Sequence, residues 1–154
     1  MISTRFYLEN LLLPPVLAGI RDQSQLRYPI GPDIAIAWTT HLDVADTAAA
    51  AFQRGPMAPD LVTVGHLPPL RGKDLAHGFS QHEGRTIEFQ PITPTEFGTA
   101  IEPIIGAAAA LAVTALYASL ADVPEISFDT TDSAQQQLGL SPRSVERWLS
   151  DLRV

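Results

Sequence analysis

Four histidines are the side chains in this sequence best suited to acid–base chemistry, because imidazole changes its charge near neutral pH. His41 follows an alternating apolar stretch at residues 34–39, and His66 follows a second apolar stretch at residues 61–64. If these stretches are parallel neighbouring strands, both rings lie at the carboxyl ends of the strands, where open α/β sheets place ligands. A small-molecule enzyme that uses His41 and His66 is therefore one hypothesis for function.

The other two histidines lie in the polar segment 71–85, where Asp74 and Glu83 accompany His77 and His82. Such a group can in principle ligate a cation, but positions five apart do not share a helix face, and the spacing does not match H-E-x-x-H. The segment contains three glycines, which favour an irregular, mobile loop. We therefore expect solvated histidines here and no metal site.

Further catalytic signatures are missing from the sequence. It contains no cysteine and no G-x-S-x-G, and its glycines are scattered one at a time instead of forming a phosphate-binding loop. Paired carboxylates such as Glu125 and Asp129 are available, but any acidic strand offers such a pair. We expect no catalytic residue and no cofactor, and therefore a protein that is not an enzyme.

The charge distribution is the most specific signal. The formal net charge is −7, and residues 86–142 contain seven acids and no lysine or arginine: Glu88, Glu96, Glu102, Asp122, Glu125, Asp129 and Asp132. In two predicted strands, Glu88 and the pair Glu125 and Asp129 lie opposite the apolar side chains. If those strands share a sheet, the acids form one face that attracts a basic protein. We predict partner binding by Glu88, Glu125, Asp129 and Asp132; the alternative is an acidic face that only keeps the protein in solution.

The segment 131–150 resembles the helix-turn-helix of bacterial DNA-binding domains. With Gly139 at the turn, the expected apolar positions hold Leu138, Leu140, Val145 and Trp148, whereas Gln135 stands where a small residue is usual. The resemblance implies a recognition helix at 142–150 whose DNA contacts are Arg143, Ser144 and Arg147. The segment 131–154 is electrically neutral, which disfavours nucleic acid as a partner. In the alternative interpretation, two short helices joined by a glycine turn pack five apolar residues onto the core: Leu138, Leu140, Val145, Trp148 and Leu152.

The elements that must position these residues follow from hydrophobic periodicity and turn signals. The opening stretch 3–13 fits either a strand or a short helix, and Thr93 or Thr95 begins a helix that Pro103 interrupts. We predict strands at 34–39, 61–64, 86–92 and 125–129, and helices at 44–54, 132–138 and 142–152, with Asp43 and Ser141 as N-caps of the first and last helices. The fold class is α+β or α/β, with four to five strands, in a single domain over residues 1–154.

Residues 103–121 run for nineteen positions without a charge, the length of a membrane-spanning helix. Alanine makes up much of this run, and its flanks are Glu102 and Asp122 instead of basic residues. We therefore predict an alanine-rich helix buried in a soluble domain, and no membrane association. Glu9 and the Pro14-Pro15 pair argue against a signal peptide, and together with the absence of cysteine they favour a cytoplasmic location.

From these features we predict a non-catalytic cytoplasmic protein of the immunity or antitoxin type, an inhibitor whose acidic face binds and neutralises a basic protein partner. The alternatives are a transcriptional regulator that binds DNA through residues 131–150, and the small-molecule enzyme with His41 and His66.

Overall fold

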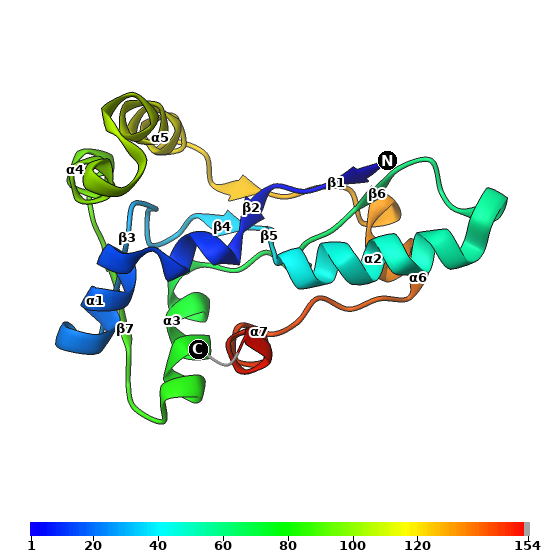
Figure 1. The fold of residues 1–154 in the computed structure, drawn as a ribbon, viewed down its shortest axis with the longest axis horizontal. Coiled ribbons are helices and arrows are strands. Elements are labelled where there is room, and N and C mark those ends of the chain that lie inside the picture. The colour runs from blue at the N-terminus through cyan, green and yellow to red at the C-terminus, as the bar shows by residue number, and fades with distance from the viewer. Residues whose placement is uncertain (153–154) are drawn as a thin grey trace. The chain divides into compact units, whose positions relative to one another are not determined.

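The computed structural model describes residues 1–152, which form two compact units (Figure 1). Unit 1 consists of Met1–Glu9, Ala35–Leu70 and the chain from Glu125 onward, and unit 2 consists of Asn10–Ile34 and Arg71–Pro124. Both units are assembled from segments that are separated in the sequence. The division therefore does not correspond to one boundary along the single domain predicted for residues 1–154.

Every strand pair of the described chain is parallel, and the strands alternate with helices. In unit 1, β1 (Ile2–Ser3) pairs with β6 (Val62–Thr63), β2 (Phe6–Tyr7) with β5 (Trp38–Thr39), and β4 (Ala35–Ile36) with β8 (Glu125–Ile126). In unit 2, β3 (Gln25–Tyr28) pairs with β7 (Glu88–Pro91). The fold class is α/β, within the prediction, although the strands are shorter than expected.

Unit 1 contains the helices α2 (His41–Arg54), α6 (Ala134–Leu138) and α7 (Val145–Leu152), with short 3-10 turns at Gly55–Met57 and Thr130–Asp132 and another, Leu8–Leu12, that begins in it. Helix α2 starts three residues before the predicted position, because Thr40 and not Asp43 caps it: Thr40 Oγ1 accepts a hydrogen bond from the Asp43 backbone at 2.9 Å. The core of this unit contains Trp38 and Trp148, both fully buried.

Unit 2 contains α1 (Pro14–Gln23), α3 (Gly72–Glu83), α4 (Pro94–Ile105) and α5 (Ala107–Ser119). Three buried aromatic rings join β3 to both helices of the α4–α5 pair: the ring centroid of Tyr28 lies 5.2 Å from that of Phe97 and 5.5 Å from that of Tyr117. The hydroxyl groups of Tyr28 and Tyr117 are hydrogen-bonded to each other. Burial raises the pKa of Tyr117 to about 12.

The prediction of a mobile loop at residues 71–85 is wrong, because most of this segment forms helix α3. The backbone N–H of Arg71 donates to the side chain of Asp74 at 2.8 Å, which fixes the first turn. Leu75 and Phe79, four positions apart, are buried on one face, and Gly84 ends the helix with a φ of 65°. The glycines suggested a loop, but this apolar face and the terminal glycine determine the structure.

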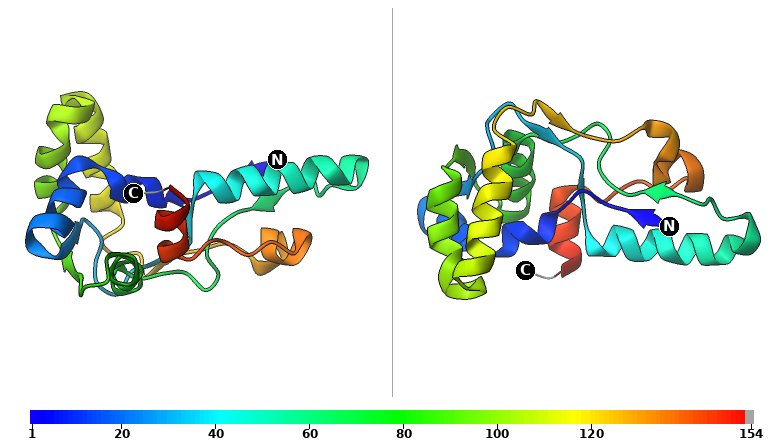
Figure 2. Two further views of the ribbon diagram at one scale, coloured as in Figure 1. Left: turned by 60° about the horizontal axis from the view of Figure 1, so that its bottom comes forward. Right: turned by 90° about the horizontal axis from the view of Figure 1, so that it is seen from above.

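The prediction of one buried alanine-rich helix is also wrong. Helix α4 continues through Pro103 and ends at Gly106, whose φ is 81°, and α5 then returns alongside it as Figure 2 shows. In α5 Ala110 and Tyr117 are buried, whereas Leu111 is 72% exposed. Among residues 1–152, no helix has both the length and the apolar character that crossing a membrane requires.

The two predicted C-terminal helices are present, as α6 and α7. Of the five residues that the packing interpretation places on the core, Leu138, Val145 and Trp148 are buried, and Leu140 and Leu152 are partly buried. Helix α7 begins after Ser144, whose hydroxyl accepts from the backbone of Arg147 at 3.2 Å, so the predicted cap at Ser141 is wrong.

The α4–α5 contact leaves no room for a side chain at Gly98. A Cβ there would lie 2.0 Å from Thr114 Oγ1, which already donates to the carbonyl of Ala110. We expect Gly98→Ala to lower the free energy of unfolding by about 1–3 kcal/mol, as overpacking does. The double variant Gly98→Ala with Thr114→Ala should recover part of this loss in urea denaturation; additive losses would contradict the packing argument.

The buried tyrosine pair predicts a loss of stability at alkaline pH. Because burial raises the pKa of Tyr117 from 10.0 to about 12, its contribution to stability is fully present below pH 10 and is lost as the pH rises toward 12. Tyr117→Phe should reduce the decline in unfolding free energy between pH 10 and 12 by about 2 kcal/mol, one pKa unit being about 1.4 kcal/mol. Urea denaturation at pH 8, 10 and 11.5 gives the unfolding free energy of both proteins at each pH. The same decline with pH in the wild type and in Tyr117→Phe would refute the raised pKa of Tyr117 as its cause.

Candidate functional site

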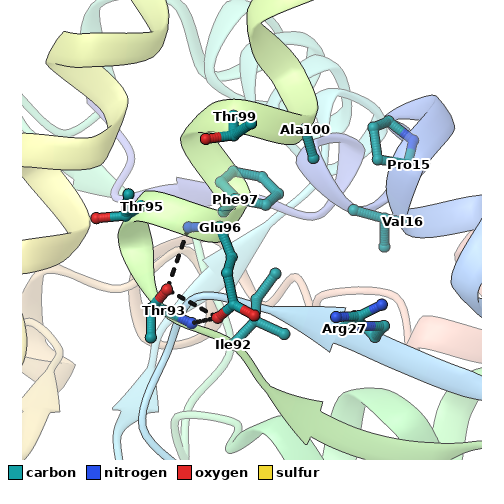
Figure 3. A pocket seen from close by; sticks show the side chains of 10 residues that line it. All are labelled: Pro15, Val16, Arg27, Ile92, Thr93, Thr95, Glu96, Phe97, Thr99 and Ala100. Atoms are coloured by element: carbon teal, nitrogen blue, oxygen red, sulfur yellow. Dashed lines mark hydrogen bonds between the residues drawn. The ribbon is translucent and has the colours of Figure 1, made fainter.

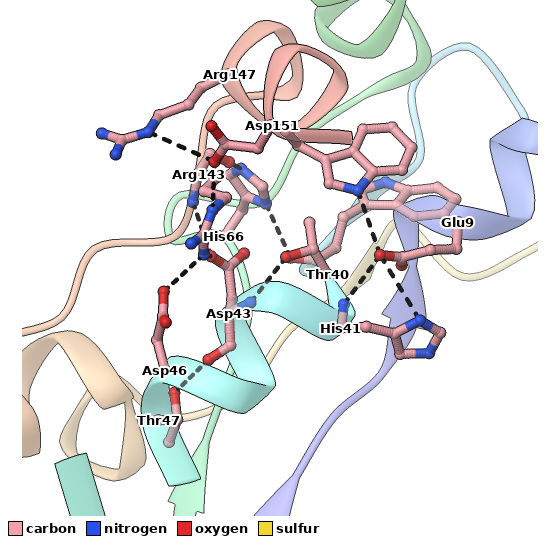
Figure 4. A network of polar contacts seen from close by, with 12 residues as sticks. Glu9, Thr40, His41, Asp43, Asp46, Thr47, His66, Arg143, Arg147 and Asp151 are labelled. Atoms are coloured by element: carbon pink, nitrogen blue, oxygen red, sulfur yellow. Dashed lines mark hydrogen bonds and ion pairs between the residues drawn. The ribbon is translucent and has the colours of Figure 1, made fainter. Parts of the chain in front are cut away.

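An ion cluster in unit 1 surrounds the guanidinium of Arg143 (Figure 4). Its Nη1 lies 2.7 Å from Asp43 Oδ1 and 2.8 Å from Asp46 Oδ2, and its Nε lies 2.8 Å from Asp151 Oδ2. Burial by itself would lower the pKa of Arg143, but hydrogen bonds to Asp151, Asp43 and Asp46 raise it above the usual value. The cluster connects the first turn of α2 to the segment that leads into α7.

His66 belongs to the same region and contacts two backbone carbonyls. Its Nδ1 lies 2.8 Å from the carbonyl oxygen of Trp38, and its Nε2 lies 2.9 Å from that of Arg143. The ring thus joins the end of β5 to the C-terminal segment and is buried. This geometry assigns His66 a structural role.

His41 lies apart from His66 and contacts Glu9. The Glu9 carboxylate accepts from the His41 backbone at 3.0 Å and from Trp148 Nε1 at 3.2 Å, and His41 Nδ1 lies 3.8 Å from it. His41 is mostly exposed, and neither histidine lines the cavity beside α1, β3 and α4 or the small hollow beside α2 and α6. The structure therefore does not bring together the two rings that the enzyme hypothesis requires.

The four predicted acidic residues do not share one sheet. Glu88 is in β7, which pairs with β3 in unit 2, whereas Glu125 is in β8, which pairs with β4 in unit 1. Asp129 caps the 3-10 turn that contains Asp132: its carboxylate accepts from the backbone and hydroxyl of Thr131, which lower the pKa of Asp129. The condition that these strands share one sheet is not met.

Two of the three predicted DNA contacts in the helix-turn-helix-like segment, Arg143 and Ser144, are engaged within the protein, whereas Arg147 is 72% exposed. Arg143 is held by three carboxylates, and the Ser144 hydroxyl caps α7. The helix before the turn, α6, contains only five residues. The segment therefore serves packing.

The histidines of α3 do not form a metal site. His77 is within hydrogen-bond distance of Gln81, one turn further along the helix. Among residues 1–152, no three His, Asp or Glu side chains are grouped closely enough to hold a metal ion.

Unit 2 contains a cavity of about 460 Å³ between α1, β3 and the first turns of α4 (Figure 3). Its lining is apolar apart from one charge of each sign and three threonines: Pro15, Val16, Arg27, Ile92, Thr93, Thr95, Glu96, Phe97, Thr99 and Ala100. Val16 and Phe97 are almost completely buried. The volume is within the range of about 300–1,000 Å³ that is usual for small-molecule sites.

The two charged residues of this cavity do not form an ion pair. Within the described part of the chain, the Arg27 guanidinium makes no hydrogen bond and no ion pair, and Glu96 uses one carboxylate oxygen, Oε2, to accept from the backbone and hydroxyl of Thr93. These hydrogen bonds, and more weakly the charge of Arg27, lower the pKa of Glu96. Glu96 is therefore ionised at neutral pH.

Sequence reasoning did not identify this cavity. Glu96 was predicted only as one of the seven acids of residues 86–142, and no pattern in the sequence singles out Arg27. The capping signal T-x-x-E at Thr93 and Glu96 is readable in the sequence, but the approach of α1 and β3 to that helix start is not.

No protein-family model matches this sequence, and no curated protein matches it. Solved structures do match. A nucleoside-diphosphate-sugar epimerase from Staphylococcus aureus superposes with a TM-score of 0.73 at 19% identity, over 96% of this chain and 50% of its own. The Citrobacter sp. triphenylmethane reductase complexed with NADP(H) has a TM-score of 0.73 at 15% identity, over 97% and 51%.

A third match is an NADPH-dependent quinone oxidoreductase from Escherichia coli, with a TM-score of 0.59 at 16% identity over 91% of this chain and 51% of its own. The chain thus spans about half the length of these proteins and shares the Rossmann-like α/β fold over that half. This finding overturns the prediction of an immunity- or antitoxin-type inhibitor, and with it the DNA-binding alternative, because nearly the whole chain has the fold of part of a reductase or epimerase.

The described residues do not provide the glycine-rich cradle with which such folds hold a dinucleotide pyrophosphate. A Cβ at Gly72 would lie 2.4 Å from the ring of Phe89, and one at Gly65 would lie 3.0 Å from the carbonyl oxygen of Ala37. These glycines thus accommodate the protein's own atoms and do not line an open cradle.

The ion cluster predicts different consequences for two arginines on the same segment. Arg143→Met leaves Asp43, which is 5% exposed, without its cation, and should lower the free energy of unfolding by about 3 kcal/mol. Arg147 is 72% exposed and its guanidinium lies 3.8 Å from Asp151, so Arg147→Met should change the free energy of unfolding by less than about 0.5 kcal/mol. Urea denaturation compares the two, and equal effects would show that the cluster is not stabilising.

Proposed function

We propose that this chain is one half of an NAD(P)-dependent protein of the reductase or epimerase kind, and that it acts with a dinucleotide-binding half. The observation that carries the proposal is the structural match, in which 96% and 97% of this chain cover 50% and 51% of two such proteins at TM-scores of 0.73. One of these two is an epimerase and the other is a reductase complexed with NADP(H).

The arrangement of glycines supports a division of roles between the halves. Because the described residues form no glycine-rich cradle, the proposal assigns the pyrophosphate contacts to the companion half. This chain then supplies parallel strands that extend the sheet, together with unit 2. A nicotinamide cofactor brings the redox chemistry in such proteins, and the protein binds and orients the reactants. A cytoplasmic location is part of this proposal.

Unit 1 has features that a companion half would complete. Its parallel strands are two residues long, and parallel sheets of proteins are normally covered on both faces. Three of its large apolar side chains are exposed to water: Met1 by 80%, Phe52 by 85% and Met57 by 86%. Covering by a second layer would bury such groups.

A chimera tests the proposal. In it, this chain replaces the half of the Citrobacter reductase that the structural match covers and is joined to the half that the match leaves out. We expect the chimera to bind NADPH with saturation, measured by the fluorescence of the bound nicotinamide, and this chain alone to show no saturation below about 1 mM, a binding free energy of only about −4 kcal/mol.

Two controls make the result decisive. The remaining reductase half without this chain should bind NADPH more weakly than the chimera, and the chimera with Arg143→Met should lose binding as unit 1 is destabilised. A folded chimera that binds no NADPH would refute the proposal. Tight NADPH binding by this chain alone would refute the assignment of the pyrophosphate contacts to the companion half.

A further inference from the structure

The cavity of unit 2 has the composition of a small-molecule site and is not used by the proposed function. Its volume is about 460 Å³, and its accessible apolar lining comes from Pro15, Ile92 and Ala100 (Figure 3). Val16 and Phe97 are only 1% and 2% exposed, so they lie beneath this lining as part of the core. Such a surface binds an apolar group by removing it from water.

Arg27 provides a cation that the protein itself does not neutralise. Its side chain is half-buried in β3 and forms no hydrogen bond or ion pair with residues 1–152. Arg143, by contrast, has three carboxylate partners. A guanidinium that lacks a protein partner and lines a cavity is suited to a carboxylate, which it binds through two parallel hydrogen bonds.

Glu96 provides the opposite charge on the same cavity. Both of its hydrogen bonds, from the backbone and the hydroxyl of Thr93, end on Oε2. Its Oε1 forms none with the described residues, which leaves it available to a ligand. The carboxylate is attached to the first turn of α4 by this capping interaction, so its position is fixed.

The two charges together restrict the ligand. A doubly charged anion such as phosphate would be attracted by Arg27 but repelled by Glu96. A simple amine would be attracted by Glu96 but repelled by Arg27. A zwitterion satisfies both groups, and its apolar body fits the remaining lining.

We propose that the cavity between α1, β3 and α4 binds a small apolar α-amino acid, or a ligand with that head group, whose carboxylate pairs with Arg27 and whose ammonium group pairs with Glu96. Its side chain packs against Pro15, Ile92 and Ala100. The site lies entirely within unit 2 and does not depend on a dinucleotide or on a companion half.

The test uses three probes that share a phenyl group and differ in charge: L-phenylalanine, 3-phenylpropionate and 2-phenylethylamine. Isothermal titration calorimetry on the full chain should show phenylalanine binding about tenfold more tightly than either single-charge probe, since a hydrogen-bonded charge contributes roughly 1.5–3 kcal/mol, and 1.4 kcal/mol is tenfold. Inorganic phosphate should not compete.

Variants assign each charge to its partner. Arg27→Gln should weaken phenylalanine and 3-phenylpropionate about tenfold and leave 2-phenylethylamine unchanged, whereas Glu96→Gln should weaken phenylalanine and 2-phenylethylamine and leave 3-phenylpropionate no weaker. Glutamine at position 96 can still accept the hydrogen bonds from Thr93, so α4 keeps its cap.

Arg21→Gln is the matched control, because Arg21 lies on α1 outside the cavity, in an exposed pair with Asp22. It should leave all three affinities unchanged. The proposal is overturned if phenylalanine binds no better than the single-charge probes, if none of the three binds, or if Arg27→Gln and Arg21→Gln have the same effect while circular dichroism shows both to be folded. NADPH binding is not measured here, so these outcomes are independent of the chimera.

Discussion

Unit 1 depends on the ion cluster of Arg143. A guanidinium that is 18% exposed must keep its carboxylate partners, since an unpaired buried charge costs several kcal/mol. The same residue uses its backbone as well: its N–H donates to Asp43 at 3.2 Å, and its carbonyl contacts His66. The segment before α7 is thereby attached to the start of α2, and Trp148 on α7 is placed where its indole N–H reaches Glu9. One residue thus attaches the segment that leads into α7 to the start of α2 through both its side chain and its backbone.

The sequence predicted elements whose signals are local. Thr93, one of the two threonines predicted to start a helix, caps α4, and Gly55 caps the end of α2, as expected. Tertiary contacts escaped prediction because their partners are distant: Arg143 and Asp43 are 100 residues apart. Arg143 therefore looked like a free basic residue on a recognition helix, although its charge is fully used within the fold. The alanine run was misjudged for a related reason, because hydropathy does not reveal that Gly106 reverses the chain.

The acidic run of residues 86–142 illustrates how net charge misleads when it is treated as one surface. Glu96 and Asp129 belong to that run, yet each accepts hydrogen bonds from nearby backbone and hydroxyl groups and caps a helical turn. Glu88 and Glu125 belong to separate sheets. Part of this acidic run thus serves local caps, and in unit 2 Glu96 also lines a cavity together with Arg27.

The order of the segments along the chain has a consequence of its own. Unit 1 is assembled from three segments and unit 2 from two, so the backbone passes from one unit to the other four times. Cutting the chain at one point therefore cannot release either unit intact, and no N- or C-terminal truncation isolates one. Each unit closes only after distant parts of the chain have met, so loop-closure entropy must be offset before either core forms, and both units are expected to fold slowly for their size.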